Sequence, residues 1–108
     1  MNYAVILTAH AVLDVEEICD YITINDLPQK AEYVLTQLED SFDSLSKFPE
    51  RGGYPKELSY LGIHEYREIY FKPYRIIYKI IEKTVYIYLV VDVRRDMEAL
   101  LQRRIFEF

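Results

Sequence analysis

The chain has 108 residues, of which 51% are hydrophobic, and it contains 11 Tyr, 5 Phe and a single Cys. This length suits one domain, residues 1–108, whose core can form without a metal or a disulfide, and one cysteine excludes an internal disulfide and a cysteine-based metal site. The formal net charge of −5 argues against indiscriminate nucleic-acid binding, which depends on neutralising phosphates.

Charge is unevenly distributed along the chain. Residues 1–50 carry 10 acidic and 2 basic side chains, whereas residues 51–108 carry 8 acidic and 11 basic ones. The second half can therefore form a local basic surface. No apolar run approaches the roughly 18 residues of a membrane span, and the N-terminus lacks a signal-peptide pattern. We expect a cytoplasmic protein with no membrane association, which suits its cysteine usage.

The first half of the chain predicts a strand and two helices. Tyr3–Thr8 reads as a short strand that is apolar at successive positions, which indicates burial on both faces, and Thr8 is placed to cap a helix. That helix is expected from Ala9 to about Ile24, with Asp14 lying off its apolar stripe. The stripe consists of Ala11, Val15, Ile18, Cys19 and Ile22.

A break at residues 25–28 precedes the clearest helical pattern of the sequence. Pro28 is tolerated in the first turn of the new helix, which should end near Phe48 and Pro49. Its apolar residues recur at three- and four-residue steps: Ala31, Val34, Leu35, Leu38, Phe42 and Leu45. Because the connection is short, the two helices should pack as an antiparallel hairpin.

The second half predicts a three-stranded meander followed by a short helix. Residues 49–60 read as a loop. Strands are expected at Tyr66–Phe71, Tyr74–Ile81 and Val85–Asp92, the last with Val85, Ile87, Leu89 and Val91 on one face. Asp96–Arg104 reads as a short helix that Asp96 can cap, with Met97, Leu100 and Leu101 facing inward. This order predicts an α+β fold in which the helical hairpin covers the one apolar face of the antiparallel sheet.

Several segments in this order resemble the RelE/ParE superfamily of toxins from type II toxin–antitoxin systems. The similar stretches are residues 3–8, 48–52 and 58–67, and most specifically Lys72-Pro73-Tyr74-Arg75-Ile76-Ile77-Tyr78 and Val91-Asp92-Val93-Arg94-Arg95-Asp96-Met97. The resemblance implies a RelE/ParE-like fold, a cognate antitoxin partner and one of two targets, DNA gyrase or messenger RNA on the ribosome. The amino-acid sequence of these stretches resembles ParE-like, plasmid-stabilisation members more than RelE-like ones.

Messenger RNA cleavage requires cations on the scissile phosphate and a group that transfers protons. The resemblance implies that Arg75 and Arg94 would supply the cations in a metal-independent endoribonuclease. The C-terminal segment lacks the Tyr or His that such ribonucleases carry, and Tyr78 or Glu68 could substitute. We expect His64 to be a surface residue and Tyr66, Tyr70, Tyr74 and Tyr78 to pack in the sheet.

The gyrase interpretation, which we favour, requires an exposed and partly basic surface and no catalytic set. Residues suited to target binding are Arg67, Lys79, Arg95, Arg103, Arg104 and Phe106. Arg103 and Arg104 also suit the end of a helix, where cations favour the dipole. The last residues, 105–108, end in two aromatics that either pack on the sheet or form a hydrophobic tip.

The antitoxin implied by the resemblance would lay an amphipathic helix or a strand across the toxin. Leu13, Leu27, Tyr33 and Leu61, if exposed, suit this contact, and the acidic helical hairpin could select basic partner side chains. An inactive superfamily member that only binds an antitoxin is a third interpretation. Nothing in the sequence indicates a metal, a nucleotide or another cofactor.

Overall fold

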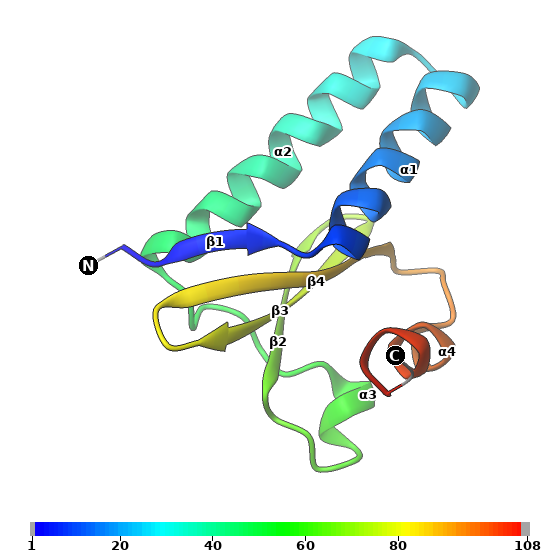
Figure 1. The fold of residues 1–108 in the computed structure, drawn as a ribbon. Coiled ribbons are helices and arrows are strands. Elements are labelled where there is room, and N and C mark those ends of the chain that lie inside the picture. Colours follow the sequence, from blue (N-terminus) through cyan, green and yellow to red (C-terminus); the bar gives the residue numbers. More distant parts are fainter. Residues whose placement is uncertain (1, 107–108) are drawn as a thin grey trace.

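The computed structural model describes residues 2–106 and contains a four-stranded sheet with helices on both faces (Figure 1). In chain order the elements are β1 (Ala4–Leu7), α1 (Ala9–Asn25), α2 (Pro28–Lys47), α3 (Lys56–Ser59), β2 (Tyr66–Phe71), β3 (Tyr74–Ile81), β4 (Thr84–Asp92), α4 (Met97–Leu101) and the π-helical turn η1 (Gln102–Phe106). Within these residues, no helix has the length and apolarity that a membrane span requires.

The helical hairpin forms as predicted. The Thr8 hydroxyl caps α1 by accepting a hydrogen bond from the Ala11 amide at 3.2 Å, and Pro28 is the first residue of α2. Both helices pack on one face of the sheet, and their far ends project beyond it (Figure 1). The end of α1 and the start of α2 therefore form a protruding arm.

The sheet has the strand order β1-β4-β3-β2. The predicted antiparallel meander of β2, β3 and β4 is confirmed, and β1 pairs parallel to β4. The prediction that the first strand is buried on both faces is wrong, because β1 lies at the sheet edge and Ile6 is 47% exposed. Its Val5 and Leu7 side chains pack toward the helices.

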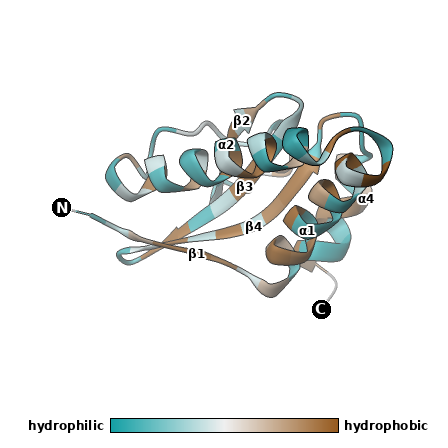
Figure 2. Ribbon diagram, turned by 90° about the horizontal axis from the view of Figure 1, so that it is seen from above, coloured by the Kyte–Doolittle hydropathy of each residue, from teal (hydrophilic) through white to brown (hydrophobic). Residues whose placement is uncertain are grey.

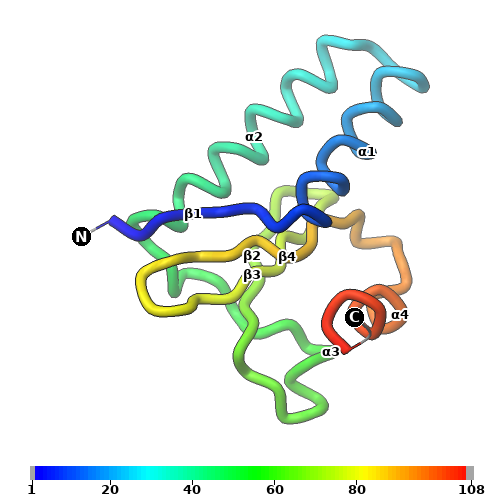
Figure 3. Tube along the Cα trace, viewed as in Figure 1, coloured from blue at the N-terminus to red at the C-terminus, as the bar shows by residue number. Residues whose placement is uncertain are grey.

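Hydrophobic clusters lie on both faces of the sheet, so the prediction of a single covered face is wrong. The hairpin covers the first cluster, which includes Leu38, Ile76 and Tyr78. The second cluster consists of Leu58, Tyr66, Ile77, Leu89, Val91, Met97, Leu100, Leu101 and Ile105. Figure 1 shows the strands between the hairpin on one side and α3 and α4 on the other, and Figure 2 shows that β1 and β4 are largely hydrophobic. In the second cluster α4 and η1 lie against α3, two segments far apart in the sequence (Figure 3).

A register shift explains why β4 serves both clusters. Ile77 pairs with Leu89 but Tyr78 pairs with Ile87, so Tyr88 is an extra residue in β4. An extra residue reverses the side-chain alternation of a strand. Val85 and Ile87 therefore face the hairpin, while Leu89 and Val91 face α4, and the prediction that all four share one face is wrong.

The segment predicted as a loop, residues 49–60, is ordered by two contacts with the sheet. The buried Tyr78 hydroxyl donates to the Pro49 carbonyl at 2.7 Å and accepts from the Gly52 amide at 3.1 Å. The segment also contains α3, which the prediction missed because one turn of helix has no apolar periodicity to read. This short helix places Glu57 beside the sheet.

Candidate functional site

A cleft of about 640 Å³ lies between α1, the end of β4 and the last helical segment. Four arginines line it: Arg94, Arg95, Arg103 and Arg104. They come from two places in the sequence, the turn after β4 and the turn η1. The cleft also contains the carboxylates of Asp14, Glu17 and Asp92 and the rings of Tyr21 and Tyr74.

In the first arginine pair, Arg94 is held by Asp92 at the end of β4. The Asp92 carboxylate accepts hydrogen bonds from the Arg94 amide at 2.9 Å and from Arg94 Nε and Nη2 at 2.9 and 2.7 Å. The Arg94 guanidinium lowers the pKa of Asp92. Asp96 then caps α4 at the Ala99 amide, as predicted. Because the Arg94 side chain is 82% exposed, it can still reach a ligand.

Asp14 anchors Arg104, one of the second pair, and was missed by the sequence analysis. It was placed off the apolar stripe of α1, yet it is 8% exposed. Its carboxylate accepts from the Val90 amide at 3.1 Å and pairs with Arg104 Nη2, while Arg104 Nη1 donates to the Tyr88 carbonyl at 3.1 Å. Burial raises the pKa of Asp14 and outweighs the opposing effect of Arg104.

Arg95 and Arg103 are the arginines of the cleft without a carboxylate partner among residues 2–106. Both are exposed, and neither forms an ion pair with a described residue. Guanidinium groups bind phosphate and carboxylate oxygens through paired donors. The cleft can therefore bind an anionic group of a partner through these two side chains.

Arg75 lies elsewhere, buried between α3 and β2. Its Nη atoms donate to the two Glu57 carboxylate oxygens at 2.9 and 2.8 Å, and its Nε donates to Glu68 at 2.8 Å. These bonds raise the pKa of Arg75 and lower that of Glu57. Two carboxylates occupy the guanidinium, so Arg75 and Arg94 do not share an open face as the ribonuclease hypothesis requires.

A sequence model described as the ParE toxin of the type II toxin–antitoxin system parDE matches residues 5–99. The chain belongs to the ParE toxin family. A solved structure described as the chromosomal ParDE toxin–antitoxin system from P. aeruginosa superposes on the toxin with a TM-score of 0.72 at 18% identity, covering 85% of this chain and 97% of that chain. That likeness confirms the fold. A search of curated proteins gave no match.

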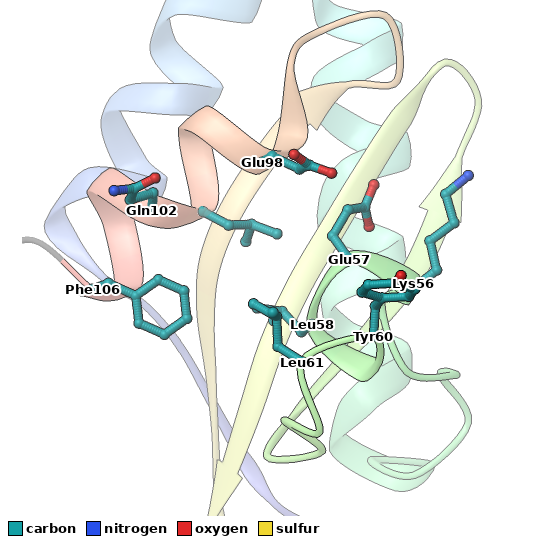
Figure 4. A pocket seen from close by; sticks show the side chains of 9 residues that line it. Lys56, Glu57, Leu58, Tyr60, Leu61, Glu98, Gln102 and Phe106 are labelled. Carbon is teal, nitrogen blue, oxygen red and sulfur yellow. The ribbon is translucent and has the colours of Figure 1, made fainter.

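The remaining residues predicted to bind the target lie outside the arginine cleft of the toxin. Arg67 donates to the Gly52 carbonyl at 2.8 Å and its guanidinium carbon lies 4.8 Å from the centroid of the Tyr54 ring, and Lys79 lies over the ring of Tyr66. Phe106 lines an apolar cavity of about 610 Å³ between α3 and η1. Figure 4 shows Phe106 and Leu61 at one end of this cavity and Glu57 and Glu98 at the other. Phe108 lies outside the described residues.

The residues predicted to bind the antitoxin are exposed, as binding to a partner requires. Leu13, Leu27 and Tyr33 lie on the helical hairpin, whereas Leu61 lies beside the apolar cavity. They therefore lie in two separate parts of the fold. Their binding role stays a prediction.

Among the described residues, Glu17, Tyr21 and Tyr74 line the cleft and could transfer protons, whereas the candidates named from the sequence are occupied or lie elsewhere. Of the two side chains that could substitute for the missing acid or base, Tyr78 is fully buried and Glu68 is bound to Arg75. His64 is exposed as predicted and makes an edge-to-face contact with the ring of Tyr54. Tyr66 and Tyr78 pack in the core as predicted, but Tyr70 is 53% exposed.

Tyr74 lines the cleft. Its pKa is raised mainly by burial and, to a smaller extent, by the negative charge of Asp92. Its phenol therefore stays protonated at neutral pH. Within residues 2–106, no group of three or more His, Cys, Asp or Glu side chains is placed to hold a metal ion.

Proposed function

We propose that this ParE-family toxin inhibits bacterial growth by binding DNA gyrase, and that it does so through the arginine cleft. The observation that carries the proposal is the enclosure of Arg75 between Glu57 and Glu68. A ribonuclease of this design requires that guanidinium to stabilise charge developing on a phosphate. A protein-binding inhibitor requires only exposed cations, which Arg95 and Arg103 offer.

The test measures both targets with one set of purified proteins. DNA supercoiling by gyrase and messenger RNA integrity in a translating extract are followed as toxin is added. The informative variant is Arg95→Ala with Arg103→Ala, and the control is Lys47→Ala, which removes an exposed cation at the end of α2. We expect wild type and control to block supercoiling, and the double variant to lose about tenfold in potency, since interfacial arginines commonly contribute more than 1 kcal/mol each.

Two results would overturn the proposal. Cut messenger RNA with unimpaired supercoiling would favour the ribonuclease alternative, and mutagenesis would then move to Arg94 and Tyr74. If the double variant still inhibited supercoiling fully, gyrase would remain the target, but the arginine cleft would not be the surface that binds it. Circular dichroism of each variant checks that it is folded.

A further inference from the structure

The apolar cavity between α3 and η1 is large enough to hold a small molecule. Its volume of about 610 Å³ lies within the range of roughly 300–1,000 Å³ that is typical of ligand pockets. Leu58 and Leu101 are the buried part of its lining, whereas Tyr60, Leu61 and Phe106 are exposed. The exposed apolar side chains give a bound molecule apolar surface to cover.

Two carboxylates distinguish one end of this cavity from the other. Figure 4 shows Glu57 and Glu98 at the end away from Phe106 and Leu61. Glu57 is held by Arg75, but Glu98 is exposed and forms no ion pair with a residue in the described part of the chain. Glu98 is therefore the carboxylate that a ligand in the cavity can reach.

The ion pairs beside the cavity leave this end with an excess of negative charge. Arg75 is a single cation paired with two carboxylates, those of Glu57 and Glu68, and Glu98 adds a further formal negative charge. The lysine of the lining, Lys56, extends to the far side of Glu57 from Glu98 (Figure 4). Coulomb's law therefore favours a positively charged group at this end and disfavours a negatively charged one.

We propose that this cavity binds a small amphipathic cation, whose apolar body contacts Leu61 and Phe106 and whose ammonium group binds the Glu98 carboxylate. An ammonium group has three hydrogen-bond donors, and a hydrogen bond between two charged groups is stronger than one between neutral groups. The lining shares no residue with the arginine cleft. The proposal therefore does not depend on gyrase being the target.

The experiment titrates ¹⁵N-labelled toxin with three matched probes and follows each backbone amide by NMR. The probes are 4-phenylbutylamine, 4-phenylbutanol and 4-phenylbutyrate, which share an apolar body and carry a positive, a neutral and a negative end. We expect the amine to shift the amides of Leu58, Leu61 and Phe106 and to bind about tenfold more tightly than the alcohol. The carboxylate should bind more weakly than the alcohol, and the amide of Leu38 beneath the hairpin should stay unchanged.

Variants with matched controls separate the charged contact from the apolar one. Glu98→Gln keeps the size of the side chain and should weaken binding of the amine about fivefold, with no change for the alcohol. Glu39→Gln makes the same charge change at an exposed position of α2 and should leave both affinities unchanged. Phe106→Ala should weaken both probes about fivefold, whereas Phe48→Ala, which removes an exposed ring after α2, should weaken neither.

Three results would overturn the proposal. Equal affinities for the amine and the alcohol, or an unchanged affinity for the amine in Glu98→Gln, would mean that the cavity does not recognise a cation. Unchanged amides at Leu58, Leu61 and Phe106 with millimolar amine would mean that the cavity does not bind it. Tighter binding of the peptide acetyl-FK-amide than of the amine would assign the cavity to the side chains of a basic protein segment. None of these measurements uses gyrase, so supercoiling assays report separately on the target.

Discussion

Gly52, in the loop after α2, packs tightly against the sheet. A Cβ atom at this position would lie 2.5 Å from the Glu68 carbonyl oxygen and 2.7 Å from the Tyr78 hydroxyl. The neighbouring Gly53 has open space around the same atom. One glycine is thus required by contact with the sheet, and the other is not.

Replacing these two glycines gives a matched pair of variants. We expect Gly52→Ala to lower the free energy of unfolding by about 1–3 kcal/mol, because backbone at Glu68 must move to accommodate the methyl group. Gly53→Ala should change it by less than about 1 kcal/mol. Urea denaturation followed by circular dichroism measures both, and equal effects would contradict this account of the loop.

Ion pairs help to hold two short elements of the fold in place. The helix α3 has four residues, too few to be stable alone, and Glu57 ties it to β3 through Arg75. Similarly, Asp14 of α1 ties η1 to the sheet through Arg104. Each of these ion pairs joins segments that are distant in sequence.

The Glu57 contact predicts a dependence of stability on pH. Its pKa is lowered from the ordinary value of 4.5 by the Arg75 hydrogen bonds, so its stabilising effect is complete above that value and is lost as the pH falls below it. Glu57→Gln should lower the free energy of unfolding at neutral pH by about 1–3 kcal/mol. The difference from wild type should shrink as the pH falls below 4.5.

The control for this measurement is Glu65→Gln, which changes an exposed glutamate outside the Arg75 contact. Its stability should follow that of the wild type at every pH. A constant difference between Glu57→Gln and wild type from neutral to acidic pH would show that the carboxylate charge does not stabilise α3.

At the scale of the whole molecule, two hydrophobic clusters share the strands β3 and β4. Ile76 and Tyr78 face the hairpin, while the intervening Ile77 faces the cluster beneath α4. Loss of either cluster removes support from the same strands. The two layers should therefore unfold together.

Truncations in the two clusters test this coupling. We expect Leu38→Ala beneath the hairpin and Leu89→Ala beneath α4 each to lower the free energy of unfolding by about 2–5 kcal/mol. Each variant should keep a single transition seen at the same midpoint by near- and far-ultraviolet circular dichroism. Separate transitions in Leu89→Ala would mean that the C-terminal layer unfolds independently.

Sequence pattern identified the main elements of the fold. The bounds of β2 and β3 agree with prediction, and so do the two side-chain caps at Thr8 and Asp96. These features depend on residues a few positions apart. The arginines after β4 were also identified, but their convergence with Arg103 and Arg104 on one cleft was not.

Local chemistry was sufficient for those assignments because alternation, helical periodicity and capping act within one element. The partners of buried charges required the folded chain, since Asp14 meets Arg104 across 90 positions and Arg75 meets Glu57 across 18. The same holds for β4, whose extra residue Tyr88 reverses the alternation that its sequence suggests. Such contacts depend on packing between layers, and no pattern along one segment encodes which charges that packing brings together.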